Sequence, residues 1–235
     1  MCYFLVAMTR PTCNSSCVNQ TWNSATNRLA QWLFDGNYRD QINNYNTTPY
    51  NPMLFTTNGY VNQAIIFNGS NTSTLVAPYL PLSNSSFTID MWLYITNLRM
   101  DKNNYALFGI CSQYLAFRCL HLIFRQVSGT FALSLDLFSS ACRGVTALTV
   151  NTWTHAAFVF DLVTLTQRIY LNGILDNNCQ TTSVVILTTT TQTTIGHIPL
   201  IAWPSDYSPY EVSTIFFSFP SKNNSIKTSR GILIN

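Results

Sequence analysis

The chain has 235 residues and a formal net charge of +3, and charged residues make up only 9% of it. Its length suits one large β-sandwich, because such domains often run to about 200 to 250 residues as a single unit. An average soluble protein carries about 25% charged residues, and a nucleic-acid binder would add a clustered basic face. The composition therefore argues against a nucleic-acid partner, and the sequence contains no apolar run long enough to span a bilayer.

Residues 1–27 show no sustained periodicity and contain Cys2, Cys13 and Cys17, so we expect an irregular leader there. Its first residues lack the preceding positive charge and the cleavage site of a convincing signal peptide. Seven cysteines without zinc-like spacing favour disulfides, and hence an oxidising compartment. Seven sequons, each a candidate glycan acceptor, agree with an extracellular or lumenal location. They begin at Asn14, Asn19, Asn46, Asn68, Asn71, Asn84 and Asn223.

Short alternating segments separated by turn residues predict strands in the first half of the chain. They cover residues 29–34, 62–67, 73–77 and 86–95. The last of these has a two-residue period with an apolar face formed by Phe87, Ile89, Met91, Leu93 and Ile95. The opposite face contains Thr88, Asp90, Trp92 and Tyr94.

Residues 106–110 and 119–125 are the predicted arms of a hairpin, followed by a strand over 130–138. Cys111 and Cys119 flank the hairpin loop, so we predict a disulfide between them. A second predicted pair, Cys142 with Cys179, depends only on the position of both residues in loops beside the next hairpin.

That next hairpin, at residues 153–173, is the expected centre of the fold. Residues 153–160 are apolar on both alternations, which predicts a central strand covered on both faces. We therefore expect Trp153 to be buried in the core, and His155 to be a hydrogen-bonded core histidine. The second arm ends at Asn172-Gly173, a strong hairpin signal.

The motif W-T-H, strand, Asp, Y-L-N-G at 153–173 resembles the core hairpin of laminin G-like jelly-roll modules, in the concanavalin A-like lectin/glucanase superfamily. Residues 86–95 and 194–196 are similar to two further strands of these modules. The resemblance implies an all-β fold, a two-sheet antiparallel jelly-roll β-sandwich, over residues 28–219. Residues 213–219 are expected as an edge strand and residues 220–235 as a tail. This stretch departs from the usual ending of such modules, and a frame error near Tyr210 is one explanation for that departure.

The superfamily includes glucanases, and a retaining glycosidase needs two carboxylates about 5 to 5.5 Å apart. The chain has a single Glu, Glu211, while Asp90 and Asp136 belong to separate predicted strands. We therefore expect neither an enzyme nor a cofactor. The resemblance leaves calcium open, with candidate ligands that are more often turn-forming residues: Asp35, Asp40, Asp161 and Asp206.

If the apolar positions of four strands point inward, their polar and aromatic partners form one outward, concave face. This face would hold Asp90, Trp92, Tyr94, His121, Arg125, Ser134, Asp136, Arg168 and Tyr170. One hypothesis is a non-catalytic extracellular recognition or adhesion module that binds a glycan or a protein there. The alternative is a structural spacer of a larger secreted or membrane-anchored protein, in which these residues only form cross-strand pairs.

Overall fold

The structure, a computed structural model, describes residues 28–70, 72–100, 104–111, 119–137, 140–182, 184 and 192–198, and the backbone of 215–218 and 232–234. Every regular element in these ranges is a strand, so this part of the chain contains no helix that could cross a membrane. The strands pair in antiparallel fashion into two sheets. The predicted leader, residues 1–27, lies outside the described residues.

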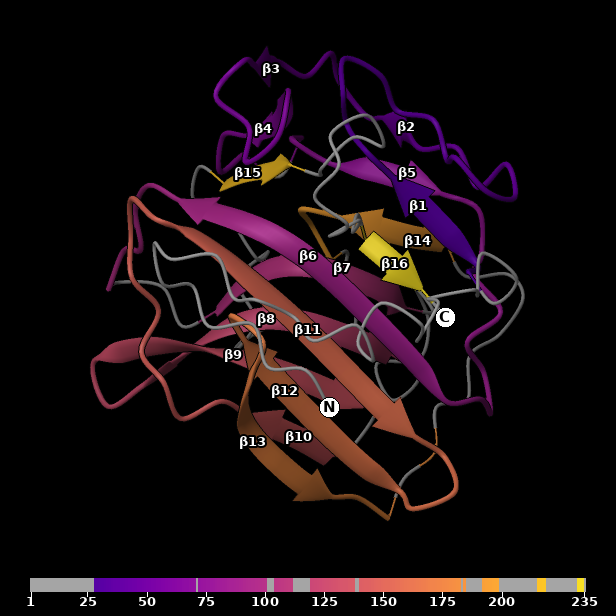
Figure 1. The fold of residues 1–235 in the computed structure, drawn as a ribbon, viewed down its shortest axis with the longest axis vertical. Coiled ribbons are helices and arrows are strands. Elements are labelled where there is room, and N and C mark those ends of the chain that lie inside the picture. Colours follow the sequence, from indigo (N-terminus) through magenta and orange to yellow (C-terminus); the bar gives the residue numbers. More distant parts are fainter. Residues whose placement is uncertain are drawn as a thin grey trace, which may run out of the picture.

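The spatial order of sheet A is β13 (Ile174–Gln180), β12 (Thr166–Leu171), β11 (Trp153–Asp161), β6 (Phe87–Ile95), β15 (Ile215–Ser218), β4 (Ala64–Phe67) and β3 (Phe55–Thr56). In this sheet the hairpin of residues 153–173 lies between the edge strand β13 and the middle strand β6 (Figure 1). A further strand, β16 (Ile232–Ile234), pairs with β6 and joins β1 (Ala30–Trp32) to the sheet.

Sheet B lies behind sheet A in Figure 1. Its spatial order is β10 (Ser140–Arg143), β9 (Thr130–Leu137), β8 (Cys119–Val127), β7 (Asn104–Cys111), β14 (Gln192–Ile195), β5 (Leu75–Ala77) and β2 (Thr48–Pro49). The predicted two-sheet antiparallel β-sandwich is therefore confirmed.

The core lies between the sheets and is built from the inward side chains of each strand. On β6 the apolar face predicted from the two-residue period is fully buried, and β11 contributes Phe158 and Phe160 beside it. Ile89, Phe158 and Ile169 lie side by side across β6, β11 and β12. Burial of each such side chain contributes about 1.5 to 3 kcal/mol to folding.

The strand β11 is central, as predicted, but it is not covered equally on both faces. Its burial alternates residue by residue, with Ala156, Phe158 and Phe160 buried and Trp153, His155 and Ala157 only half-buried. The predictions of a core position for Trp153 and for His155 are therefore wrong. Both side chains lie on the outer face of sheet A, where their rings pack against neighbouring aromatic rings and do not enter the core.

The end of the chain contributes more strands to sheet A than the sequence suggested. The backbone of β15 pairs with β6 on one side and with β4 on the other, so the predicted edge position of residues 213–219 is wrong. β16 comes from within the predicted tail 220–235 and lies along β6 beyond β15. Strand pairing therefore continues past residue 219.

Both predicted disulfides are present. Cys111 and Cys119 are directly paired residues of β7 and β8, with their Cα atoms 4.3 Å apart. The bond between Cys142 and Cys179 joins β10 of sheet B to β13 of sheet A, with a Cα separation of 5.5 Å. The Asn177 amide donates to the Arg143 carbonyl beside it, so this end of the sandwich is closed by covalent and polar links.

We expect the disulfide between the sheets to stabilise the protein more than the hairpin disulfide. Replacing Cys142 and Cys179 by Ser should lower the free energy of unfolding by about 4 kcal/mol, since the bond spans a separation of 37 residues. The same change at Cys111 and Cys119, a separation of 8, should cost about 2.5 kcal/mol. Urea unfolding of the two double variants measures both losses, and the reverse order would contradict this assignment.

Candidate functional site

The structure divides the predicted binding face between two surfaces. β6 and β12 belong to sheet A, whereas β8 and β9 belong to sheet B. Sheet A therefore carries Asp90, Trp92, Tyr94, Arg168 and Tyr170. Sheet B carries the remaining predicted residues, His121, Arg125, Ser134 and Asp136. The prediction of one continuous face is wrong, because a two-residue period says which side chains point inward but not which sheet a strand joins.

An aromatic cluster covers part of the outer face of sheet A, and it consists of Tyr60, Trp92, Tyr94, Trp153 and His155. The Tyr60 ring stacks on Trp92, with ring centroids 3.6 Å apart and an interplanar angle of 13°. Trp153 meets the same tyrosine edge-on at 6.0 Å and meets Tyr94 at 5.4 Å. Tyr60 is 43% exposed, so the cluster presents an aromatic ring to solvent.

Strand register brings the members of the aromatic cluster together. In the β6–β11 ladder, Trp153 is opposite Tyr94 and His155 is opposite Trp92. Directly opposed residues on one face are close enough for their rings to touch. Tyr60 comes from the turn between β3 and β4, and sequence reasoning missed it. The Asn58-Gly59 pair before it marked a turn, but nothing in the sequence placed that turn over β6.

Asp90 lies on the same face of β6 as Trp92 and Tyr94, but it is 2% exposed, so it is not the surface residue that we predicted. Its Oδ1 atom is 3.8 Å from Nε2 of His155. Neither of these two buried atoms has a hydrogen-bond partner in the described part of the protein. Buried polar atoms are normally satisfied, so this pair leaves unused hydrogen-bonding capacity beside the ring of Trp92.

Arg168 and Tyr170 continue the outer face of sheet A away from the aromatic cluster. Tyr170 and Asp90 flank Ala157 on either side of β11. Arg168 lies 4.0 Å from a carboxylate oxygen of Asp161. Both charged side chains are partly exposed, so solvent screens this pair.

The outer face of sheet B contains a compact charged group. Arg125 forms an ion pair with Oδ2 of Asp136, and the Ser134 hydroxyl donates to Oδ1 at 2.5 Å. Burial raises the pKa of Asp136, although the Arg125 guanidinium acts in the opposite direction. Burial, and then the same guanidinium, lowers the pKa of His121 to about 4, so its imidazole is neutral at pH 7.

The predicted calcium ligands accept hydrogen bonds from N–H groups. Both oxygens of Asp40 are taken by backbone amides, among them those of Gln31 and Tyr45 at 2.7 and 2.9 Å. Asp35 accepts from the side-chain amide of Asn62, and Asp161 accepts from two amides of its own turn. These contacts fit the turn-forming role, and calcium binding stays a prediction. Asp206 lies outside the described residues.

Three of the predicted glycan acceptors, Asn46, Asn68 and Asn84, are at exposed positions. Glycosylation there stays a prediction, and the other four sequons begin outside the described residues.

Asn46 also lines a shallow groove at the edge of sheet B, together with Pro49, the exposed Tyr50 and Gln192. This groove is separate from the aromatic cluster, since β2 and β14 belong to the other sheet.

A family model described as the concanavalin A-like lectin/glucanases superfamily matches residues 67–208, more than half of the chain. No curated protein sequence shows significant similarity to it. Among solved structures, domain 4 of AbnA has a TM-score of 0.62 and 18% identity, and the match covers 81% of this chain and 89% of that one. AbnA is an extracellular GH43 arabinanase from Geobacillus stearothermophilus, and its domain 4 is in complex with arabinotriose in that structure.

Two toxin structures are also similar in fold. The binding domain of Paraclostridial Mosquitocidal Protein 1 has a TM-score of 0.58 and 13% identity, and covers 81% of this chain and 47% of that one. Botulinum neurotoxin type C, whose cell entry depends on interaction with two ganglioside molecules, has a TM-score of 0.57 and 13% identity, with coverages of 80% and 46%. The chain thus spans about half the length of these two structures.

Because Trp92 and Trp153 lie on the same outer face, Trp92→Ala and Trp153→Ala should lower the melting temperature by similar, small amounts. Phe158→Ala is the control, since its ring is fully buried between the sheets and such a truncation costs about 3 to 5 kcal/mol. Thermal unfolding followed by circular dichroism measures all three variants. A loss for Trp153→Ala as large as that for Phe158→Ala would place Trp153 in the core after all.

The lowered pKa of His121 predicts that stability falls in mild acid. The unfolded chain binds a proton near pH 6.5 that the folded protein binds only near pH 4. The stabilisation is thus complete at pH 7 and is lost as the pH drops through this window, by up to about 3 kcal/mol. Urea unfolding from pH 7 to 4.5 should show this loss in the parent and a smaller one in His121→Gln, whereas parallel curves would contradict it. The raised pKa of Asp136 acts in the opposite direction, which is why the comparison with the variant is needed.

Proposed function

Because the chain belongs to the concanavalin A-like lectin/glucanase superfamily, we propose that it is an extracellular, non-catalytic recognition module that binds carbohydrate through the aromatic cluster of sheet A. The observation that carries this proposal is the pair formed by Tyr60 and Trp92. A 43% exposed tyrosine ring lies flat on a tryptophan, with a second tryptophan against its edge. An exposed group of large rings on a soluble protein commonly marks an interaction site.

The chemistry of the cluster suits a sugar. The apolar C–H face of a pyranose can stack on an exposed aromatic ring, while its hydroxyls need hydrogen-bond partners at the edge of that ring. His155 supplies a half-buried imidazole 5.2 Å from Trp92, measured between ring centroids. Asp90 supplies a carboxylate oxygen, Oδ1, that has no hydrogen-bond partner among the described residues. Rings for stacking and polar atoms for hydroxyls are thus adjacent.

The positions of the acidic residues support a non-catalytic role. Asp90 and Asp136 belong to different sheets and lie toward opposite outer faces, and packed sheets are about 10 Å apart. Two carboxylates on either side of a sandwich cannot both reach one glycosidic bond, as a retaining mechanism requires. Glu211 lies outside the described residues.

Proteins of similar fold support carbohydrate as the ligand class. One of them is in complex with arabinotriose, and another interacts with gangliosides during cell entry. The two disulfides support an extracellular location, because such bonds persist in oxidising compartments. A protein partner on the same surface is a second form of the recognition role.

One observation favours the alternative of a structural spacer. The Tyr60 ring already covers one face of Trp92, and rings that shield one another stabilise a sheet without any ligand. In that case the aromatic cluster closes the outer surface of sheet A and nothing binds to it.

Glycan-array binding by the purified full chain separates the two roles. We expect binding to a subset of glycans, and a loss of about tenfold or more in affinity for Tyr60→Ala and for Trp153→Ala. The matched control is Tyr50→Ala, which removes a 72% exposed tyrosine at the edge of sheet B and should bind like the parent.

A folded chain that binds no glycan would support the spacer role. Glycan binding that Tyr60→Ala leaves intact would keep the recognition role and reject the aromatic cluster as its site. Circular dichroism of each variant, compared with the parent, shows that a loss of binding is not a loss of fold.

A further inference from the structure

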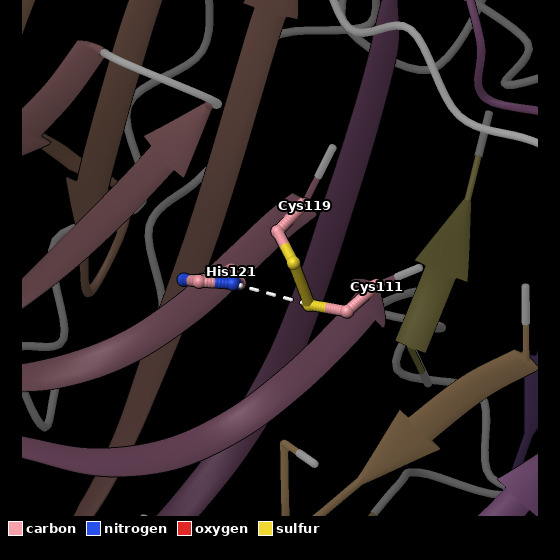
Figure 2. Close-up of side chains that lie close together, drawn as sticks. All are labelled: Cys111, Cys119 and His121. Carbon is pink, nitrogen blue, oxygen red and sulfur yellow. Dashed lines mark hydrogen bonds between the residues drawn. A yellow bond between two sulfur atoms is a disulfide. The ribbon is translucent and has the colours of Figure 1, made fainter. Parts of the chain in front are cut away.

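Cys111, Cys119 and His121 bring three metal-ligating atoms together on the outer face of sheet B (Figure 2). Cys119 and His121 are two residues apart on β8, so their side chains point to the same face. Cys111 is directly opposite Cys119 on β7. The two sulfur atoms and a ring nitrogen of His121 all lie within 4.8 Å of one another, and Nε2 is 3.1 Å from Sγ of Cys111.

We propose that this group is a zinc site when the disulfide is reduced, with two thiolates and the His121 imidazole as ligands and solvent at the fourth position. A tetrahedral zinc ion with Zn–S bonds of about 2.3 Å and a Zn–N bond of about 2.0 Å holds its ligand atoms roughly 3.5 Å apart. Nε2 of His121 is already 3.1 Å from Sγ of Cys111, close to this distance. The two sulfur atoms are bonded in the disulfide and would have to separate after reduction to admit the ion.

The sheet keeps the ligands in place without the disulfide. Cys111 pairs with Cys119 on one side and with Gln192 of β14 on the other, so β7 is held by ladders along both edges. Reduction opens the covalent link around a short loop but leaves these backbone hydrogen bonds. A preformed ligand set binds a metal without the cost of ordering the chain.

The surroundings favour a bound metal over two free thiolates. Cys111 and Cys119 are 6% and 4% exposed, and they pack with Ala106, Ile123 and Ile198 in a small apolar cluster. Burying two isolated thiolate charges in such a place is costly. Zinc carries two positive charges, so its complex with two thiolates and a neutral imidazole has no net charge.

The disulfide is exchanged for a zinc ion in two steps. A thiol reductant supplies two electrons and two protons, cleaves the S–S bond and becomes a disulfide itself. Zinc then replaces the two thiol protons, which are released to solvent. A disulfide oxidant reverses both steps, because it accepts two electrons as the Cys111–Cys119 bond forms and the ion is released, so zinc occupancy would report the redox state of the surroundings.

The test uses the full chain with Cys2, Cys13 and Cys17 replaced by Ser, so that thiols of the leader cannot bind metal. Zinc titration by calorimetry, and the thiolate-to-metal absorption of Co²⁺ as a substitute, are measured before and after reduction with a phosphine. We expect one ion per reduced chain and none per oxidised chain. His121→Ala keeps the disulfide and should weaken zinc binding by more than about 100-fold, as should Cys111→Ser. Cys142→Ser is the matched control and should bind like the parent.

A reduced chain that binds no zinc would overturn the proposal, as would a chain that unfolds on reduction and does not refold with zinc. Binding that survives in both His121→Ala and Cys111→Ser would also overturn it, because the ion would then be adventitious. Melting of oxidised His121→Ala close to the parent confirms that the variant is folded. Glycan binding is not part of this readout, so the two proposals fail independently.

Discussion

The pairing of β6 with β11 is the constraint on which both faces of sheet A depend. Eight opposed residue pairs fix this ladder from Trp153 and Tyr94 at one end to Phe160 and Phe87 at the other. Inward pairs such as Phe158 and Ile89 build the core, while outward pairs build the aromatic cluster. A slip of one residue would exchange the two sets. The apolar core therefore fixes the register, and that register fixes the position of each outer ring.

The sequence was informative about local pattern and less so about which strands are neighbours. Alternation predicted most of the longer strands and the buried face of β6, because a half-buried strand repeats every two residues. β13 was missed, since most of its residues are polar and its two aliphatic residues, Ile174 and Leu175, are adjacent and exposed instead of alternating with polar ones. Trp153 was misplaced because an apolar ring on a second alternation was read as core, whereas here it packs against Tyr60 and Tyr94 on the surface.

The disulfides show the same division between local and long-range information. Cys111 and Cys119 could be paired from a short loop alone, and the resulting hairpin places them face to face. What the sequence did not reveal is that His121 lies beside them, because this contact depends on the direction of side chains in the paired strands. Cys142 and Cys179 are 37 residues apart, and their link between the sheets is visible only in the fold.

The two outer faces differ in how their buried carboxylates are satisfied. On sheet B, Asp136 accepts from Arg125 on one oxygen and from Ser134 on the other, so its capacity is used within the protein. On sheet A, Oδ1 of Asp90 and Nε2 of His155 have no hydrogen-bond partner among the described residues. An unmet buried polar atom costs about 1 to 3 kcal/mol, and a ligand hydroxyl that reached it would recover part of that. Nε of Arg125 on sheet B also lacks a partner among the described residues, so unmet polar atoms alone do not separate the two faces. What supports sheet A as the face for a polar ligand is the exposed ring of Tyr60 on Trp92, next to His155 and its unmet nitrogen.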